Sequence, residues 1–169
     1  MNAKREAAVN DNLQRYGKHI LDSAEFTESF TQAHHIDTTV GDHTMYVSRT
    51  SLRICYYLNK LHIRTDMEDM VVGSLCHDLG IMGREDKFSN KRQCYREHPD
   101  DSVEVARKLN PELSTKTEKM IRNHMWPYTS GSPGSKEGYI LVVADKYCSV
   151  REGMRVIKNR IKKQISNNY

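Results

Sequence analysis

The stretch TDMEDMVVGSLCHDLG, residues 65–80, carries the densest helix signals in the chain. Thr65 followed by Glu68 has the spacing of a capping box, so the pattern predicts that a helix begins here. A stripe of apolar or small residues then recurs at helical spacing, at Met67, Val71 and Ser74. Gly80 is a typical helix stop. Because Asp78 closes the stripe, the pattern predicts a carboxylate on the core side of this helix.

On both sides of this stretch the readable periods are also helical. Helices are predicted over 2–16, 43–61 and 153–165. Another helix is predicted to begin at Pro99, because proline is favoured at the first helical position. A further helix is predicted to begin at the Thr115–Glu118 capping box and to end before Pro127. The apolar run 139–144 fits either a buried strand or a buried helix. Since the rest of the chain offers no clear partner strand, we interpret this run as a central buried helix. The predicted fold is a single all-α helical bundle.

The length and composition are those of one globular domain. The chain has 169 residues, of which 37% are hydrophobic and 28% charged, which is enough for a core and unlike a disordered chain. We interpret residues 1–169 as one domain with a motif-bearing core over about 40–152. The helix over 2–16 is expected to be peripheral, and the helix over 153–165 to form a basic C-terminal end.

Membrane and secreted proteins are the first classes that the sequence argues against. No apolar run approaches the roughly 20 residues of a membrane span. No apolar stretch follows Lys4 and Arg5, so a secretory signal is not expected there. The four cysteines are scattered without a CxxC pair, which argues against a disulfide scaffold and a zinc knuckle. We expect a reduced, cytoplasmic protein.

The net charge of +4 is mild, but the C-terminal end is basic. Six cations there face only Glu152: Arg151, Arg155, Lys158, Arg160, Lys162 and Lys163. No recognition motif accompanies them, so nucleic-acid binding is not expected. Apolar residues recur at helical spacing in the same segment, at Met154, Ile157, Ile161 and Ile165. We therefore interpret the cations as the solvated face of that helix.

Residues 81–97 lack a clean period and exceed the common loop length. The segment follows His77-Asp78 directly and is rich in cations, among them Arg84, Lys87 and Arg92. Two interpretations stay open. The segment is either a solvated flap or a loop that binds an anionic ligand.

The His77-Asp78 pair is weak evidence alone, because chance supplies about one such dipeptide for every two chains of this composition. The pair is more informative in combination with the other histidines and aspartates of the chain. His43 and His124 fall on the inward stripes of their helices, and Asp145 lies within the most hydrophobic segment of the chain. Buried carboxylates must be paired, hydrogen-bonded or metal-bound. Helical bundles assemble metal sites from such side chains on facing helices, so the spacing predicts a metal site in the bundle core.

The ligand types indicate which metals to expect. Imidazole with carboxylate suits divalent Mn, Fe, Co, Ni or Zn, one or two ions per chain, better than Mg. The absence of thiolates argues against a purely structural zinc site. His98, which precedes Pro99, is a further candidate ligand at the mouth of the same cavity.

The order His43, His77-Asp78, His98, His124 and Asp145 resembles the HD superfamily of metal-dependent phosphohydrolases over residues 43 to about 150. The stretch 121–127 with Asp145-Lys146 looks like small standalone bacterial HD proteins. The resemblance implies that His43, His77, Asp78 and Asp145 hold a first metal. It also implies that Asp78 bridges to a second metal held by His98 and His124. The Gly-Tyr-Pro motif of the relatives that hydrolyse cyclic di-GMP is missing, and the motif gives His19, His34 and His35 no role.

The resulting prediction is hydrolysis of a phosphomonoester or phosphodiester bond in a small, nucleotide-like metabolite by a metal-activated hydroxide. Asp78 and Lys146 are the candidate catalytic residues. The candidate substrate contacts are Arg84, Lys87, Arg92 and Lys146, although Lys146 could equally point outward. Two alternatives stay open: an HD-fold di-iron oxygenase and a non-catalytic metal- or nucleotide-binding sensor. No membrane partner is expected, and a homodimer is compatible with the sequence.

Overall fold

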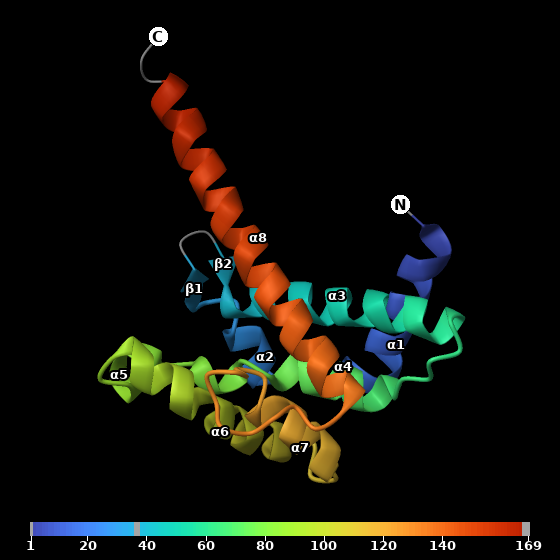
Figure 1. The fold of residues 1–169 in the computed structure, drawn as a ribbon. Helices are drawn as coiled ribbons and strands as arrows, with labels where there is room; N and C mark the ends of the chain where they lie inside the picture. Colours follow the sequence, from blue (N-terminus) through green and yellow to red (C-terminus); the bar gives the residue numbers. More distant parts are fainter. Residues whose placement is uncertain (1, 36–37, 167–169) are drawn as a thin grey trace.

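The computed structural model describes residues 2–35 and 38–166 (Figure 1). In chain order the elements are α1 Ala3–Leu21, α2 Ala24–Glu28, β1 Ala33–His35, β2 Thr38–Thr39, α3 Val40–Lys60, α4 Met67–Cys76, the 3-10 turn η1 Leu79–Ile81, α5 Arg84–Lys87, α6 Lys91–Leu109, α7 Thr115–Arg122 and α8 Lys136–Ser166. The prediction of an all-α bundle is confirmed. The sheet found in the described part of the chain is a small antiparallel hairpin of β1 and β2. None of the described helices has both the length and the apolar character needed to cross a bilayer.

Helix α4 lies at the centre of the bundle. Every residue from Met70 to Cys76 is buried, and α1, α3, α7 and α8 all pack against this helix. A helix that is apolar on all sides is stable only when it is covered in this way. The approach of α1 is close, because a Cβ built on Gly17 would lie 2.6 Å from Leu75 Cδ1. The N-terminal helix extends to Leu21, beyond the predicted 2–16, and its inward residues join the main core.

The predicted start and end of α4 are wrong. Its cap is Asp66, whose side chain accepts the N–H of Asp69, while the Thr65 hydroxyl donates to Asn59 instead. The helix ends at Cys76 and the chain turns into η1. Asp78 therefore lies at a tight corner rather than on a helical stripe. The predicted cap of α7 is also one residue late, since Ser114 rather than Thr115 accepts the N–H of the third residue of the helix.

Pro99 lies inside α6 and does not begin it. The helix starts eight residues earlier, where the Asn90 side chain caps the N–H of Gln93. Pro99 cannot donate to the carbonyl of Tyr95, so the helix tolerates one missing bond at this point. Residues 81–97 are consequently not an irregular loop, because they contain the end of η1, all of α5 and the start of α6.

Helix α8 runs for 31 residues, crosses α3 and extends beyond the other elements (Figure 1). The predicted helix over 139–144 is confirmed as part of it. In its C-terminal half the described cations Arg151, Arg155, Lys158 and Arg160 are exposed, as interpreted from the sequence. The apolar residues that were expected to face inward there are exposed too, Met154 by 57% and Ile157 by 59%. The residues buried there are Glu152 and Val156. The side chains of Ile161 and Ile165 lie outside the described residues.

Candidate metal centre

The structure brings all six sequence-predicted metal ligands together in the core. They reach the centre from five parts of the fold: His43 from the first turn of α3, His77 and Asp78 from the corner after α4, His98 from α6, His124 from the turn after α7 and Asp145 from α8. All six are buried, with exposed fractions between 0% and 6%. A group of four imidazoles and two carboxylates at such depth requires mutual pairing or a cation.

Asp78 lies between two groups of imidazoles. Its Oδ1 is 3.3 Å from His98 Nε2 and 3.2 Å from His124 Nε2. Its Oδ2 is 3.4 Å from His77 Nε2 and 3.7 Å from His43 Nε2. One carboxylate thus presents a different oxygen to each group, which is the arrangement that a carboxylate bridging two cations needs.

Three of the imidazoles are oriented by the backbone. Each donates Nδ1–H to a carbonyl three or four residues earlier: His77 to Ser74 (2.8 Å), His98 to Cys94 (2.7 Å) and His124 to Ile121 (2.7 Å). Nε2 is therefore the atom that each ring presents to the centre, where it can hold a proton or a metal ion. Among the described residues, the buried His77 Nε2 has no hydrogen-bond partner. His98 Nε2 and His124 Nε2 lie only 3.1 Å apart. This donor set fits a cation better than an apolar core.

Two carboxylates hold the ring of His43. Its Nδ1 lies 3.1 Å from Glu152 Oε1, and its Nε2 lies 3.1 Å from Asp145 Oδ1. A carboxylate on the outer nitrogen of a ligating histidine fixes the ring and raises its basicity. Sequence reasoning missed Glu152. The available signal was its position two helical turns after Asp145, which places both on one face of α8.

Burial and the neighbouring carboxylates shift the pKa values of the buried histidines in opposite directions. Burial lowers the pKa of His43, but hydrogen bonds with Asp145 and Glu152 outweigh burial and raise it to about 10. Burial also lowers the pKa of His98, but the hydrogen bond with Asp78 outweighs burial and raises the pKa to about 10. For His124 burial prevails, and its pKa falls to about 4. A metal ion that enters this centre must displace protons from His43 and His98, so its binding releases protons.

Among the residues that the structure describes, three sets of side chains could each hold a metal ion, with ligand atoms within 4.8 Å of one another: His43, His77 and Asp145; Asp78, His98 and His124; and His34, His43 and Asp78. The third set adds a residue to which the motif gave no role. His34 Nε2 is 3.4 Å from Asp78 Oδ2, and its ring stacks on His43 at 4.2 Å between centroids. No local pattern around His34 in the sequence indicates this contact.

Two of the predicted substrate contacts lie beside the centre. Lys146 Nζ is 2.7 Å from Asp145 Oδ2, and its side chain is 37% exposed, so its ammonium group lies at the edge of the metal ligands. Arg84 Nη1 donates to the backbone carbonyl of His34 at 3.1 Å. Together with His34, Arg84 lines a pocket of about 330 Å³.

The other two predicted contacts lie apart from that pocket. Lys87 Nζ bonds Asp101 Oδ2 at 2.9 Å and the carbonyl of Gly80 at 3.2 Å. Arg92 is exposed on α6 and is not among the described residues that line the pocket. The geometry therefore favours Arg84 and Lys146 over Lys87 and Arg92 as anion contacts.

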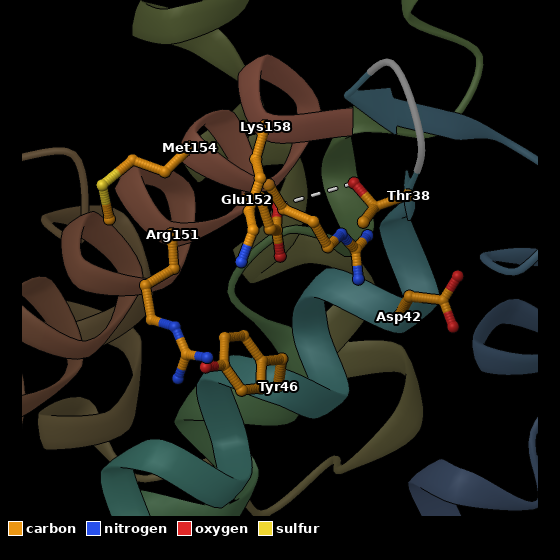
Figure 2. A pocket seen from close by; sticks show the side chains of 8 residues that line it. Thr38, Asp42, Tyr46, Arg151, Glu152, Met154 and Lys158 are labelled. Carbon is orange, nitrogen blue, oxygen red and sulfur yellow. Dashed lines mark hydrogen bonds between the residues drawn. The ribbon is translucent and has the colours of Figure 1, made fainter. Parts of the chain in front are cut away.

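A larger pocket of about 690 Å³ lies between the start of α3 and the distal part of α8 (Figure 2). Its wall includes Glu152, together with Tyr46 and Arg151, whose guanidinium lies 5.4 Å from the Tyr46 ring. Glu152 contacts the Nδ1 side of His43, opposite the nitrogen that faces Asp145. This pocket thus borders the residue that supports His43 and not the ligand atoms. The smaller pocket is the better candidate for substrate because its wall includes His34, which contacts Asp78 directly.

The family comparison agrees with this geometry. Residues 40–149 match the HD domain family, and the chain belongs to that family. Membership confirms the resemblance predicted from the motif and indicates chemistry of the metal-dependent phosphohydrolase type. No curated protein and no solved structure matches the chain. The matched range contains all six predicted ligands, but it begins after His34 and ends before Glu152.

Proposed function

We propose that this protein hydrolyses a phosphomonoester or phosphodiester bond in a nucleotide or related small phosphorylated metabolite, using two divalent transition-metal ions. The observation that carries the proposal is the position of Asp78. Its two oxygens face separate groups of imidazoles whose Nε2 atoms converge on the same buried space. Binuclear hydrolases place two ions about 3.5–4 Å apart around such a bridging ligand.

The residues divide between the two ions as follows. His43, His77, Asp78 and Asp145 would hold the first ion, and Asp78, His98 and His124 the second. Bound ions of this kind supply a water of lowered pKa and polarise phosphoryl oxygens. Mn, Fe, Co, Ni and Zn suit this imidazole-rich set, whereas Mg prefers a shell of oxygen ligands.

The chain's own cations would stabilise the charge that accumulates on the phosphoryl group. Lys146 is the nearest, since its ammonium group lies against Asp145 and is still partly exposed. Arg84 lies at the pocket, where its guanidinium can bind two phosphate oxygens at once. Glu152 is a positioning residue, because both of its carboxylate oxygens lie 3.1 Å from the outer nitrogen of His43.

The test combines elemental analysis with a hydrolysis screen. The purified protein is loaded separately with Mn, Fe, Co, Ni and Zn, and each form is assayed on aryl phosphomonoesters, aryl phosphodiesters and nucleoside mono-, di- and triphosphates. We expect about two ions per chain and hydrolysis that proceeds without oxygen. Asp78→Asn is the matched control, because it keeps the size of the side chain and removes the bridging charge.

The alternatives give different results in the same experiment. Turnover that requires oxygen and an iron pair would identify the oxygenase class. Stable metal binding without turnover on any phosphoester would identify a sensor module. Reproducible failure to bind any of the metals would refute the proposal as a whole.

A further inference from the structure

His34 lies between the buried centre and the 330 Å³ pocket. We propose that His34 is an additional ligand of the first metal ion, on the side of that ion that faces this pocket, and that a phosphate group entering the pocket takes its place. This inference rests on the proposed function. It adds a residue from outside the range that the HD family matches, and it names the route by which the substrate reaches the centre.

The side chain of His34 points into the centre. Its Nε2 lies 3.4 Å from Asp78 Oδ2, and only 10% of the side chain is exposed. The ring is stacked on His43, with centroids 4.2 Å apart and an interplanar angle of 24°. Its ligand atom lies within 4.8 Å of those of His43 and Asp78, so one ion could contact all three. Imidazole is a ligand type that the expected metals favour.

The backbone that carries His34 is anchored to the segment that follows His77-Asp78. Gln32 donates to the carbonyl of Ile81 at 2.9 Å and accepts the N–H of Gly83 at 2.6 Å. Arg84 donates to the carbonyl of His34 at 3.1 Å. These three bonds join the hairpin to η1 and α5, although the two segments are about 50 residues apart in the sequence. The imidazole is thus held in place by the same segment that positions Asp78.

The position of the pocket indicates that an entering ligand reaches His34 before it reaches the first ion. Of the described ligand-type side chains grouped around Asp78, His34 is the one that lines this pocket. His43 and Asp78 lie behind it, with exposed side-chain fractions of 0% and 6%. Arg84 and Lys91 also line the pocket, and with Glu85 in the same wall the charged side chains leave one net positive charge for a phosphate. A phosphorylated ligand in this pocket therefore meets His34 before it meets the first ion.

Cobalt(II) is the probe, because its visible absorption reports the ligands around the ion and does not depend on turnover. The wild-type protein, His34→Ala and His34→Gln are each titrated with cobalt, with and without inorganic phosphate. His19→Ala is the control, since His19 is an exposed histidine on α1. We expect loss of His34 to weaken binding of the first ion by at least about 10-fold and to change its spectrum. The second ion should bind as in the wild type.

Phosphate distinguishes an exchangeable ligand from a permanent one. At saturating phosphate the spectra of the wild type and of the His34 variants should become the same, because phosphate then replaces His34 in the wild type. If the spectra and affinities already agree without phosphate, His34 is not a ligand. If they still differ at saturating phosphate, His34 is a ligand that phosphate does not displace. Circular dichroism checks that each variant is folded, and the Gln variant serves if the Ala variant is not.

Failure of this inference is distinguishable from failure of the proposed function. If the wild type binds cobalt and hydrolyses phosphoesters, and the His34 variants have the same cobalt affinity and spectra as the wild type, only the proposed role of His34 is overturned. A wild-type protein that binds no cobalt would overturn both.

Discussion

Gly80→Ala tests whether a close approach of two backbones positions the second half of the metal centre. A Cβ at Gly80 would lie 2.6 Å from the carbonyl carbon of Asp101, and still closer to the amide of Ser102 and the carbonyl oxygen of His98. All three are backbone atoms of α6, so no side chain can rotate away to make room. Ordinary carbon contacts lie at 3.4–4 Å, and therefore η1 and α6 must separate by about 1 Å.

The expected cost follows from that separation. Overpacking of a close contact costs about 1–3 kcal/mol. Loss of the bond from the Gly80 N–H to Ser102 Oγ, now 2.9 Å, adds about 1 kcal/mol. The free energy of unfolding should fall by about 2–4 kcal/mol in total, which corresponds to a decrease in Tm of about 5–15 °C for a chain of this size. His98 belongs to the displaced helix, so its Nε2 should move away from Asp78 Oδ1, and binding of the second ion should weaken.

Urea denaturation of the metal-free protein measures the first effect, and calorimetric titration with cobalt or manganese measures the second. Gly153→Ala is the matched control, because a Cβ there meets nothing within 4 Å. This control should be neutral or should stabilise α8 by up to about 1 kcal/mol. If Gly80→Ala has the stability and the metal stoichiometry of the wild type, the contact between η1 and α6 does not position His98.

The remaining predictions concern single side chains. Asp78→Ala should abolish hydrolysis and reduce the metal content of a protein that is still folded, as steady-state kinetics, elemental analysis and circular dichroism will show; near-normal turnover would contradict its bridging role. Glu152→Gln should weaken binding of the first ion by about 10- to 100-fold in a chelator competition, and an unchanged affinity would exclude a supporting role. Arg84→Ala should raise KM for phosphoesters without emptying the centre, whereas unchanged kinetics would leave Lys146 as the main phosphate contact. Hydrogen bonds from Arg53 lower the pKa of Glu6 to about 2. Glu6→Gln should therefore lower Tm at pH 7, and the difference in Tm from the wild type should shrink as the pH falls from about 4.5 to 2. A difference in Tm that does not change with pH would refute the contribution of this ion pair to stability.

Local sequence predicted the burial of the ligands better than it predicted their geometry. Asp78 was expected on the core side of a helix and is indeed buried, but it lies at a corner because α4 ends at Cys76 and the chain turns into η1. At the other end of the same helix the cap is Asp66 and not Thr65. Pro99 was interpreted as a helix start because proline is favoured there, yet the Asn90 cap begins the helix two turns earlier. In both places a second good capping residue, Asp66 or Asn90, lies near the one that was chosen from the sequence, and the structure uses this second residue.

Apolar periodicity shows that a helix has two faces, but it does not show which face another element covers. At Val143, Met154 and Ile157 the apolar face of α8 is exposed, and in its distal half the inward positions belong to Glu152 and Val156. The reason is that α3 crosses α8 at an angle and covers only part of its length (Figure 1). The apolar pattern of one helix does not indicate where another helix crosses it.

The same limit explains why His34 and Glu152 were missed while the six motif residues were found. Glu152 contacts His43 across 109 positions of the sequence, and His34 contacts Asp78 from a hairpin that lies before the region shared with the family. The spacing from Asp145 places Glu152 on the same face of α8 but does not name its contact with His43, and no such spacing exists for His34. The six shared residues form the candidate metal centre. The two residues outside the family match both adjoin His43: Glu152 bonds its outer nitrogen, and His34 stacks on its ring and lines the pocket. The features that distinguish this chain's centre from a general HD site should therefore depend on the hairpin before α3 and on the distal half of α8.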